Sequence, residues 1–393
     1  MSTLLFNPID RLRPVGGPCG YLYNLQSGLE SLGASDRVDF LPPCHTGAFG
    51  FIRSKLWDKA PLSLRERYRR LKQKSDYETL LSAQSSNASL IFNYAQVHFH
   101  SPVSLYQCRE ELSKYEGTVI LTSHSPCACH IELFDSISTE YGERFASECG
   151  DLSVIDEYAF NRADILVFPT EYSVEPYLNS WPRFAEIIKN KRLMYLLTGI
   201  KEPSPKVERS SVRELYNIPE SAFVVCYTGR HNEIKGYDLL KEAAEPLLES
   251  HPNIVFLVAG KQAPLRGIDH SRWIEAGWTD DPHSLMRASD LFVLPNRETY
   301  FDLVLLEALA VGIPVLATRT GGNKWFSQQD GIILVDPNPS SLKRGICQLV
   351  SKDKEALQKM GLSNRALYER EFTNEVFACR YLKLLEEIDS RNA

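Results

Sequence analysis

The sequence lacks the features of a membrane-spanning, secreted or low-complexity protein. No apolar run reaches the roughly 18–20 residues that a spanning helix needs. Residues 1–10 carry neither a basic region nor a long apolar region, so we expect no secretory signal peptide. The chain also has no repeat of solenoid period and no low-complexity tract.

The nine cysteines do not suggest a disulfide framework, because their number is odd and their spacing is irregular. This pattern favours reduced thiols and a cytoplasmic protein. Cys127, Cys129 and His130 stand close together, but no second pair of ligands follows at a spacing that suits zinc. We therefore interpret these cysteines as small buried thiols. We also expect no metal and no cofactor, as the resemblance described below implies.

What is present is ordinary globular composition over 393 residues, with 43% hydrophobic and 24% charged residues. A chain of this length predicts two domains, since single domains usually span about 100–200 residues. The formal net charge of −6 argues against a nucleic-acid partner.

Positive charge is concentrated in one segment. From Arg53 to Lys74 there are nine basic and two acidic residues, so this stretch carries +7 and the rest about −13. We expect residues 65–74 to be helical. One interpretation is a solvated surface helix. The other is contact with anionic lipid headgroups, where each basic side chain is worth about 1 kcal/mol.

Strand and helix signals alternate along the whole chain, which predicts an α/β fold made of two doubly wound domains. We divide it into an N-terminal domain (1–197), a linker (198–211), a second domain (212–371) and a closing helix (372–393). Near-continuous apolar runs, typical of buried parallel strands, mark the expected strands. They lie at 4–6, 89–92, 118–122, 165–168, 223–227, 254–258, 291–294 and 314–317. Helical spacing marks the expected helices, at 21–32, 236–250, 283–288, 303–310, 339–350 and 374–388.

Ligands of such folds bind at the carboxyl ends of the strands, so the loops that follow strands are the first candidates. In the loop at 227–236, Gly229 allows close approach of the backbone, and Arg230 and Lys235 precede an expected helix. Two cations near a helix N-terminus suit an anion such as a phosphate. The alternative is an ordinary solvated loop.

Two further loops carry weaker signals. The loop at 295–302 contains Glu298, and Glu307 follows on a largely apolar helix, where a carboxylate needs a partner. Sugar hydroxyls could donate to it, as could a helix cap or a structural arginine. In the third loop, Gly321 and Gly322 either bring backbone N–H groups to an anion or form a simple turn.

In combination these features resemble a known family. The pattern GR-x4-KG at 229–236, the run ASDLFVLP at 288–295, the run FDLVLLEALAVGIPVLAT at 301–318 and the following glycine pair are similar to glycosyltransferase family 4. That family consists of retaining enzymes of the GT-B fold. The resemblance to its nucleotide-sugar domain covers about residues 222–337. It implies two Rossmann-like domains that face each other across a cleft, with a closing helix that crosses back to the first domain.

The resemblance extends more weakly to the N-terminal half. Gly16 and Gly17 look like the family's glycine loop, which faces the acceptor and the donor phosphates. His98 or His100 and His124 look like its two histidine-bearing strand ends. His124 would then be the active-site histidine near the donor sugar.

The resemblance also implies a mechanism that needs no metal. Arg230 and Lys235 would hold the diphosphate of the donor and stabilise the leaving group. Glu307 would bind the ribose hydroxyls. Trp278 would lie where the family holds the base, although a buried structural tryptophan is the alternative. The remaining implied donor contacts are Gly229, Thr299, Phe301, Asp302, Leu303, Gly321 and Gly322.

One departure from the family pattern concerns its pair of glutamates, which are separated by seven residues. Counting back from Glu307 places the first at Thr299, whereas the sequence has Glu298 one residue earlier. Asp302 stands where the family has a glycine after Phe301. Either Glu298 reaches the sugar through a shifted loop or Asp302 takes over part of that task.

The sequence therefore predicts a retaining glycosyltransferase of the hexosyltransferase type. Its donor would be a UDP- or GDP-linked sugar and its acceptor a glycan or a lipid-linked molecule. By family analogy we expect a role in bacterial surface polysaccharide or glycolipid synthesis, at the inner face of the cytoplasmic membrane. Two alternatives are a non-catalytic protein that binds sugar nucleotides and a GT-B sugar-nucleotide epimerase.

Overall fold

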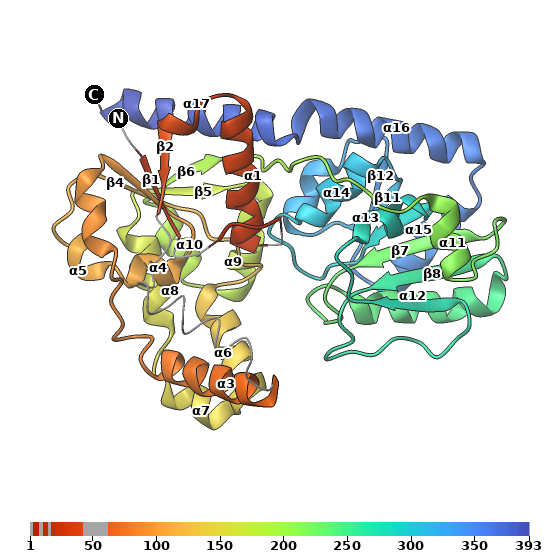
Figure 1. The fold of residues 1–393 in the computed structure, drawn as a ribbon, viewed down its shortest axis with the longest axis horizontal. Helices are drawn as coiled ribbons and strands as arrows, with labels where there is room; N and C mark the ends of the chain where they lie inside the picture. Colours follow the sequence, from red (N-terminus) through yellow and green to blue (C-terminus); the bar gives the residue numbers. More distant parts are fainter. Residues whose placement is uncertain (1–2, 8–10, 15–16, 42–61, 393) are drawn as a thin grey trace. The chain divides into compact units, whose positions relative to one another are not determined.

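The computed structural model describes residues 3–7, 11–14, 17–41 and 62–392, and the chain divides into two units. Unit 1 comprises Met1–Tyr23, Ala34–Phe168 and Tyr177–Met194. Unit 2 comprises Asn24–Gly33, Pro169–Pro176 and Tyr195–Ala393. Each unit is built around its own six-stranded sheet (Figure 1).

The sheet of unit 1 has the strand order β2-β1-β3-β4-β5-β6. Strand β1 pairs in parallel with β2 and β3, and β4 pairs in parallel with β3 and β5. The strands are β1 (Thr3–Phe6), β2 (Val38–Phe40), β3 (Gln96–Phe99), β4 (Thr118–Leu121), β5 (Ile165–Phe168) and β6 (Arg192–Tyr195). The helices that lie wholly or partly in unit 1 are α1 (Gly17–Ser31), α3 (Leu62–Glu78), α4 (Pro102–Tyr106), α5 (Arg109–Leu112), α6 (Cys129–Tyr141), α7 (Glu143–Glu148), α8 (Ser153–Arg162), α9 (Glu175–Ser180) and α10 (Phe184–Ile188).

The sheet of unit 2 has the order β12-β11-β10-β7-β8-β9, with parallel pairing throughout. The strands are β7 (Phe223–Thr228), β8 (Ile254–Ala259), β9 (Trp273–Gly277), β10 (Leu291–Leu294), β11 (Val315–Thr318) and β12 (Ile332–Val335). The helices are α11 (Arg209–Leu215), α12 (Tyr237–Ser250), α13 (Pro282–Arg287), α14 (Leu303–Val311), α15 (Pro339–Val350), α16 (Lys354–Glu371) and α17 (Asn374–Asn392).

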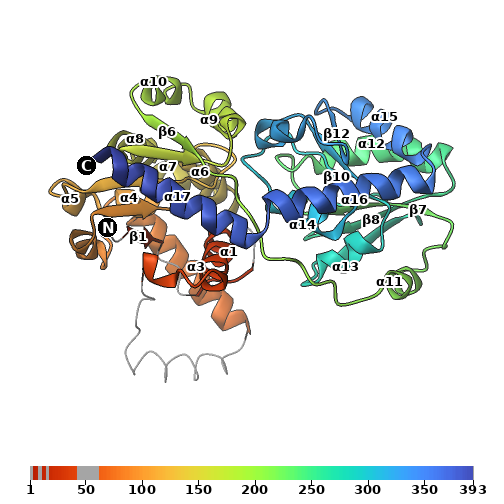
Figure 2. The same ribbon diagram turned by 90° about the horizontal axis from the view of Figure 1, so that it is seen from above.

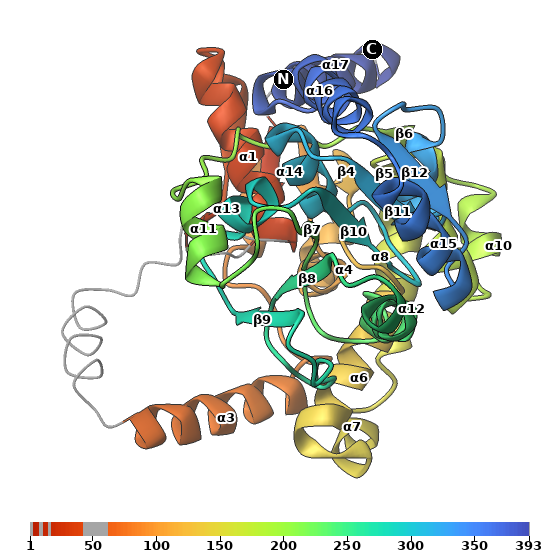
Figure 3. The same ribbon diagram turned by 90° about the vertical axis from the view of Figure 1, so that its right-hand side faces the viewer.

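Helices cover both faces of the sheet of unit 2. On one face α12 packs against α15, and on the other α14 packs against α13 and α16 (Figure 3). The strands β8, β10 and β11 are buried along their full length, which explains their near-continuous apolar sequence. The strand order reverses between β7 and β10, and such a switch point is where doubly wound sheets bind ligands.

The predicted strand at 89–92 is wrong, since these residues lie in a 3-10 helix, Ala88–Asn93. Ile91 is fully buried whereas Phe92 is 49% exposed, so the apolar run does not face a sheet on both sides. The neighbouring strand is β3, whose polar Gln96 and His98 are buried and hydrogen-bonded to Thr3 and Thr122. Because these buried polar side chains interrupt the apolar run, a search for apolar runs does not detect β3.

The predicted closing helix is present as α17, which follows α16 after two residues (Figure 2). Within unit 2, part of α1 packs closely on it, because a Cβ on Gly28 would lie 2.1 Å from the carbonyl oxygen of Asn374. The predicted linker is not wholly irregular. Ile200 donates its N–H to the carbonyl of Phe372 at 2.8 Å, and α11 begins at Arg209.

Candidate functional site at the carboxyl edge of the unit 2 sheet

Two of the predicted loops pack directly on each other. Gly236 ends the loop after β7 with a left-handed conformation (φ 64°), and a Cβ there would lie 1.8 Å from the carbonyl oxygen of Pro295. Only glycine fits such an approach. The backbone N–H of Arg297 also donates to the carbonyl of Ile234 at 3.0 Å. The loops after β7 and β10 are thus held together at the switch point of the sheet.

The third predicted loop, after β11, joins the same edge. A Cβ on Gly321 would lie 1.9 Å from the carbonyl oxygen of Thr299, and one on Gly322 would lie 2.3 Å from that of Tyr300. The glycine pair therefore has a packing reason in addition to the proposed anion contact. The three loops that the sequence singled out separately thus pack together at one edge of the unit 2 sheet.

Lys235 and Asp302 form an ion pair at the centre of this site, with 2.6 Å between Nζ and Oδ1. The other carboxylate oxygen of Asp302 accepts a hydrogen bond from Asn296. Burial by itself would raise the pKa of Asp302, but the Lys235 ammonium and the Asn296 amide hold that pKa below its ordinary value. Asp302 is thus a carboxylate that neutralises Lys235 in this structure.

Arg230 presents its side chain to solvent on the same edge. Its backbone is fixed, because the buried hydroxyl of Tyr227 donates to the Arg230 carbonyl at 2.7 Å. Among the residues that the structure describes, none forms a hydrogen bond or ion pair with the guanidinium. A fixed backbone with an exposed guanidinium is suited to bind an anion from solution.

The other predicted donor contacts differ in their surroundings. Phe301 is buried against Phe326 and Phe372, with ring centroids 5.8 and 6.3 Å away, so it has a packing role. Thr299 is fully buried, and Glu298 is half-buried with its backbone N–H 3.5 Å from the Ile234 carbonyl. Gly229 and Leu303 lie in the loop after β7 and at the first position of α14.

Glu307 has a protein partner that the sequence did not indicate. Oε2 of Glu307 lies 3.3 Å from Nε2 of His283, across the packed helices α13 and α14. The partner is therefore neither a cap nor an arginine. Both side chains retain exposure, 28% for Glu307 and 22% for His283. Trp278 is 78% exposed after β9, which excludes the alternative of a buried structural tryptophan.

Sequence reasoning missed a second ion pair at this edge. The carboxylate of Glu175 pairs with the Lys324 ammonium, and its Oε1 accepts the Gly321 N–H at 3.4 Å. The only sequence signal for this pair was the position of Lys324, which lies within three residues of the glycine pair. Its acidic partner is 149 residues away, so only the fold could identify it.

In unit 1 the three predicted histidines form one cluster with Tyr21. His100 Nδ1 lies 3.1 Å from His124 Nε2, and the His98 and His100 rings are 4.2 Å apart. The Tyr21 ring lies 4.7 Å from the His124 ring. Burial lowers the pKa of both His98 and His124 to about 3, so the cluster is neutral near pH 7. Gly17 begins α1 with a φ of +72°, and Gly16 lies outside the described residues.

The predicted basic helix is present as α3, which spans Leu62–Glu78. Arg67, Arg69 and Lys72 are exposed, whereas Arg70 contacts Glu140 at 3.8 Å; Arg53, Lys55 and Lys59 lie outside the described residues. No helix in the described part of the chain is long and apolar enough to cross a bilayer.

The thiols of Cys127 and Cys129 are partly buried, and burial raises the pKa of both. Nearby His130 pairs instead with Asp156, with 2.7 Å between Nδ1 and Oδ2. The described residues contain no group of three or more His, Cys, Asp or Glu side chains arranged to hold a metal ion.

Residues 222–352 match the family model described as "Glycosyl transferases group 1". The chain is 26% identical over 229 residues to a D-inositol 3-phosphate glycosyltransferase of Corynebacterium urealyticum, covering 52% of each chain. It is 29% identical over 184 residues to the lipopolysaccharide core biosynthesis glycosyltransferase LpsE of Rhizobium meliloti, covering 44% of this chain and 52% of the relative. The chain thus spans about half the length of these relatives.

Solved structures share the whole fold. A sucrose-phosphate synthase from Thermosynechococcus elongatus matches with a TM-score of 0.65 at 18% identity, covering 99% of both chains. HepE from Anabaena, solved with UDP-glucose, matches with a TM-score of 0.61 at 16% identity, covering 98% of this chain and 100% of HepE. At these identities the likeness shows the fold, and it confirms the predicted GT-B class with two doubly wound sheets.

Proposed function

We propose that this chain is a glycosyltransferase that moves a sugar from a nucleoside-diphosphate sugar to a glycan or a lipid-linked acceptor. One observation carries the proposal: the loops after β7, β10 and β11 meet at the switch point of one parallel sheet. All three loops lie within residues 222–352, which match the group 1 glycosyltransferase model. The names of the relatives, and the UDP-glucose in the HepE structure, support a nucleotide-sugar donor.

In this proposal Arg230 and Lys235 bind the donor diphosphate. The exposed guanidinium of Arg230 offers two parallel N–H donors to phosphate oxygens. Lys235 reaches the phosphates by exchanging its Asp302 partner for the ligand. Both cations then stabilise the charge that develops on the leaving diphosphate, a task for which electrostatics is usually the largest contribution. A resident metal ion has no role in this mechanism.

The roles of the carboxylates follow from their surroundings. Asp302, displaced from Lys235 by the diphosphate, becomes available to hydroxyls of the donor sugar, and Glu298 is the other candidate for that contact. Glu307 binds the ribose hydroxyls by exchanging its contact with His283. Exposed Trp278 packs on the base, and His124 contacts the donor sugar. Gly16 and Gly17 provide backbone N–H groups. The N–H groups of Gly229, Gly321 and Gly322 donate to Ala259, Glu175 and Thr299, so these three glycines contribute the close approach of the backbone instead.

The remaining parts of the proposal rest on the resemblance to glycosyltransferase family 4. The transfer retains the anomeric configuration, the donor is UDP- or GDP-linked, and the sugar is a hexose. The acceptor belongs to a bacterial surface polysaccharide or glycolipid pathway. The protein works in the cytoplasm at the inner membrane face, with the basic segment of α3 against anionic lipid.

Calorimetric titration with UDP and with GDP tests the donor site. We expect one of them to bind the wild type, and Arg230→Ala/Lys235→Ala to lose that binding. The matched control is Lys354→Ala/Lys359→Ala, which removes two exposed cations from α16 and should bind as the wild type does. If neither nucleotide binds the wild type, the proposal fails.

Incubation with nucleotide sugars then separates the activities. Transfer to an acceptor supports the proposed function. Consumption of the donor without transfer would indicate an epimerase, and binding without turnover over a wide acceptor set would indicate a sugar-nucleotide-binding partner protein. NMR of the product's anomeric proton tests retention.

A further inference from the structure

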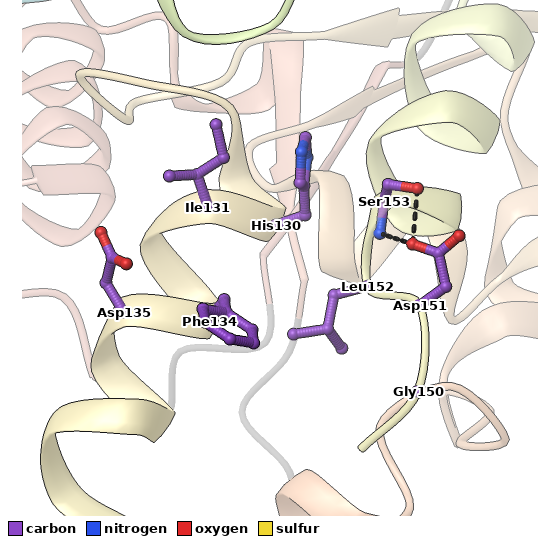
Figure 4. Close-up of a pocket in the computed structure, with 8 residues that line it drawn as sticks. All are labelled: His130, Ile131, Phe134, Asp135, Gly150, Asp151, Leu152 and Ser153. Atoms are coloured by element: carbon purple, nitrogen blue, oxygen red, sulfur yellow. Dashed lines mark hydrogen bonds between the residues drawn. The ribbon is translucent and has the colours of Figure 1, made fainter. Parts of the chain in front are cut away.

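Unit 1 contains a pocket that the proposed donor chemistry does not use. It lies between the first turns of α6 and the segment that leads from α7 into α8. Figure 4 shows its lining, with Leu152 reaching toward the Phe134 ring and the carboxylates of Asp135 and Asp151 on opposite sides. Phe134 is 38% exposed, so part of its ring is open to solvent at this pocket.

His130 is held rigidly at this pocket. Its Nδ1 lies 2.7 Å from Oδ2 of Asp156, a carboxylate with no solvent exposure. The ring also meets the Trp181 ring edge-on, at 5.7 Å between centroids. The contact with Asp156 at Nδ1 fixes the orientation of the imidazole. Nε2 is then the ring nitrogen that can exchange a hydrogen bond with a ligand.

Asp156 has a structural role that does not explain the imidazole. It accepts the backbone N–H groups of Cys129 at 3.2 Å and of His130 at 2.6 Å, and so caps the N-terminus of α6. This substitutes for Ala128, whose side chain cannot cap. The cap would be complete with any side chain at position 130.

Asp151 is also oriented, by Ser153. The Ser153 N–H at 3.0 Å and its hydroxyl at 2.6 Å both donate to Oδ1. These two hydrogen bonds, the side-chain bond foremost, lower the pKa of Asp151 and keep it ionised. Among the described residues, none donates to its second oxygen, Oδ2.

The chemistry of this lining defines a ligand class. An exposed aromatic ring can cover the C–H face of a sugar, while Asp151 accepts hydrogen bonds from hydroxyls and Nε2 of His130 can exchange one with them. The lining contains two aspartates and no lysine or arginine, so it opposes a phosphate. We propose that the pocket formed by His130, Phe134, Asp151 and Leu152 binds an uncharged sugar ring. The view that this sugar ring belongs to the acceptor rests on the proposed function, whereas the binding of a sugar ring to the pocket does not.

Saturation-transfer NMR with methyl α-glucoside, methyl α-galactoside and methyl α-mannoside, without nucleotide, tests this proposal. We expect at least one glycoside to bind and Phe134→Ala to weaken it about fivefold or more, because the ring loses its apolar platform. Asp151→Asn should weaken it too. The matched control is Phe92→Ala, which removes another exposed phenylalanine of unit 1 and should leave binding unchanged. Circular dichroism checks that each variant is folded.

Two results would overturn the proposal. One is that no glycoside gives a signal that depends on Phe134. The other is that glucose 1-phosphate binds this pocket more tightly than the neutral glycosides do. The UDP and GDP titration is an independent test. If glycosides bind but no nucleotide does, the proposed function is rejected and the sugar pocket is supported. If a nucleotide binds but no glycoside does, the sugar pocket is rejected and the proposed function is supported.

Discussion

The Lys235 ammonium lies 2.6 Å from the carboxylate of Asp302, 67 residues further along the chain. We expect Asp302→Asn to lower the free energy of unfolding by about 1–2 kcal/mol at pH 7, since a largely buried Lys235 loses its counter-charge. The folded-state pKa of Asp302 is lowered, so its contribution is present above the unfolded value of about 3.9 and is lost as pH falls further. Urea unfolding at pH 7 and at pH 3 should therefore show a smaller difference between wild type and variant at pH 3. An equal difference at both pH values would contradict this interpretation.

Arg213 of unit 2 is buried, with 1% of its surface exposed. Its guanidinium donates to Asp290 at 2.9 Å and to the carbonyls of Ala288 at 3.0 Å and Glu220 at 3.1 Å. We expect Arg213→Met to cost about 3 kcal/mol, because several acceptors lose their donors. Arg209→Met, which removes the 36% exposed partner of the same Asp290, should cost less than about 1 kcal/mol. Denaturant unfolding measures both, and equal losses would argue against burial as the cause.

The buried histidines predict a loss of stability in mild acid. The folded-state pKa values of His98 and His124 are lowered to about 3, so the unfolded chain binds more protons than the folded one below about pH 6.5. Stability is fully present above that pH and decreases as pH falls toward 3, by up to about 1.4 kcal/mol per pH unit for each histidine. Urea unfolding from pH 7.5 to 4.5 should show this slope, and His98→Asn should reduce it. An unchanged slope in the variant would assign the acid sensitivity to other groups.

Variants of Glu307 and His283 can show whether Glu307 contacts the ligand or only forms a structural pair with His283. If Glu307 binds ribose, Glu307→Gln should weaken UDP or GDP binding about tenfold, since a charged hydrogen bond is worth about 1.5–3 kcal/mol. His283→Gln, which removes only the protein partner, should leave nucleotide affinity nearly unchanged. Calorimetry on both variants is the measurement. Equal affinity but equally reduced thermal stability in both would indicate a purely structural pair.

The exposed cations of α3 predict binding to anionic bilayers. Reversing Arg67, Arg69 and Lys72 to glutamate should abolish sedimentation with phosphatidylglycerol vesicles, because each basic residue contributes about 1 kcal/mol at such a surface. Arg70 is left in place because it contacts Glu140. Phosphatidylcholine vesicles should bind neither protein. Reversal of three exposed lysines elsewhere, Lys354, Lys359 and Lys383, is the matched control. Unchanged binding after the α3 reversal would exclude this surface.

The local sequence was sufficient to predict those helices and strands that are marked by local capping residues or by a regular apolar pattern. The helices α15 and α14 were predicted within one residue of their observed ends, because capping residues and glycine mark those ends. The strand β3 was obscured because its polar Gln96 and His98 are satisfied by Thr3 of β1 and by Thr122, directly after β4. No local pattern can indicate a partner so far away in the chain.

The candidate site divides in the same way. The residues that bear charge, Arg230, Lys235, Glu298, Asp302 and Glu307, were all identifiable from residue type, spacing and family resemblance. The ion pairs that these residues form could not be predicted, because tertiary packing determines which charged side chains come close together. His283 at Glu307 and Glu175 at Lys324 became partners only when loops and helices from distant segments were brought together.

By itself the sequence determined the α/β class, the strand–helix order of the second half and the three loops that meet at one sheet edge, because buried parallel strands and glycine-dependent turns leave a direct mark on composition. Tertiary structure alone decided that Lys235 is neutralised by Asp302, that Trp278 is exposed and that His130 is oriented by a buried Asp156. These depend on distances between residues far apart in the chain, since electrostatics and burial act through space rather than along the sequence.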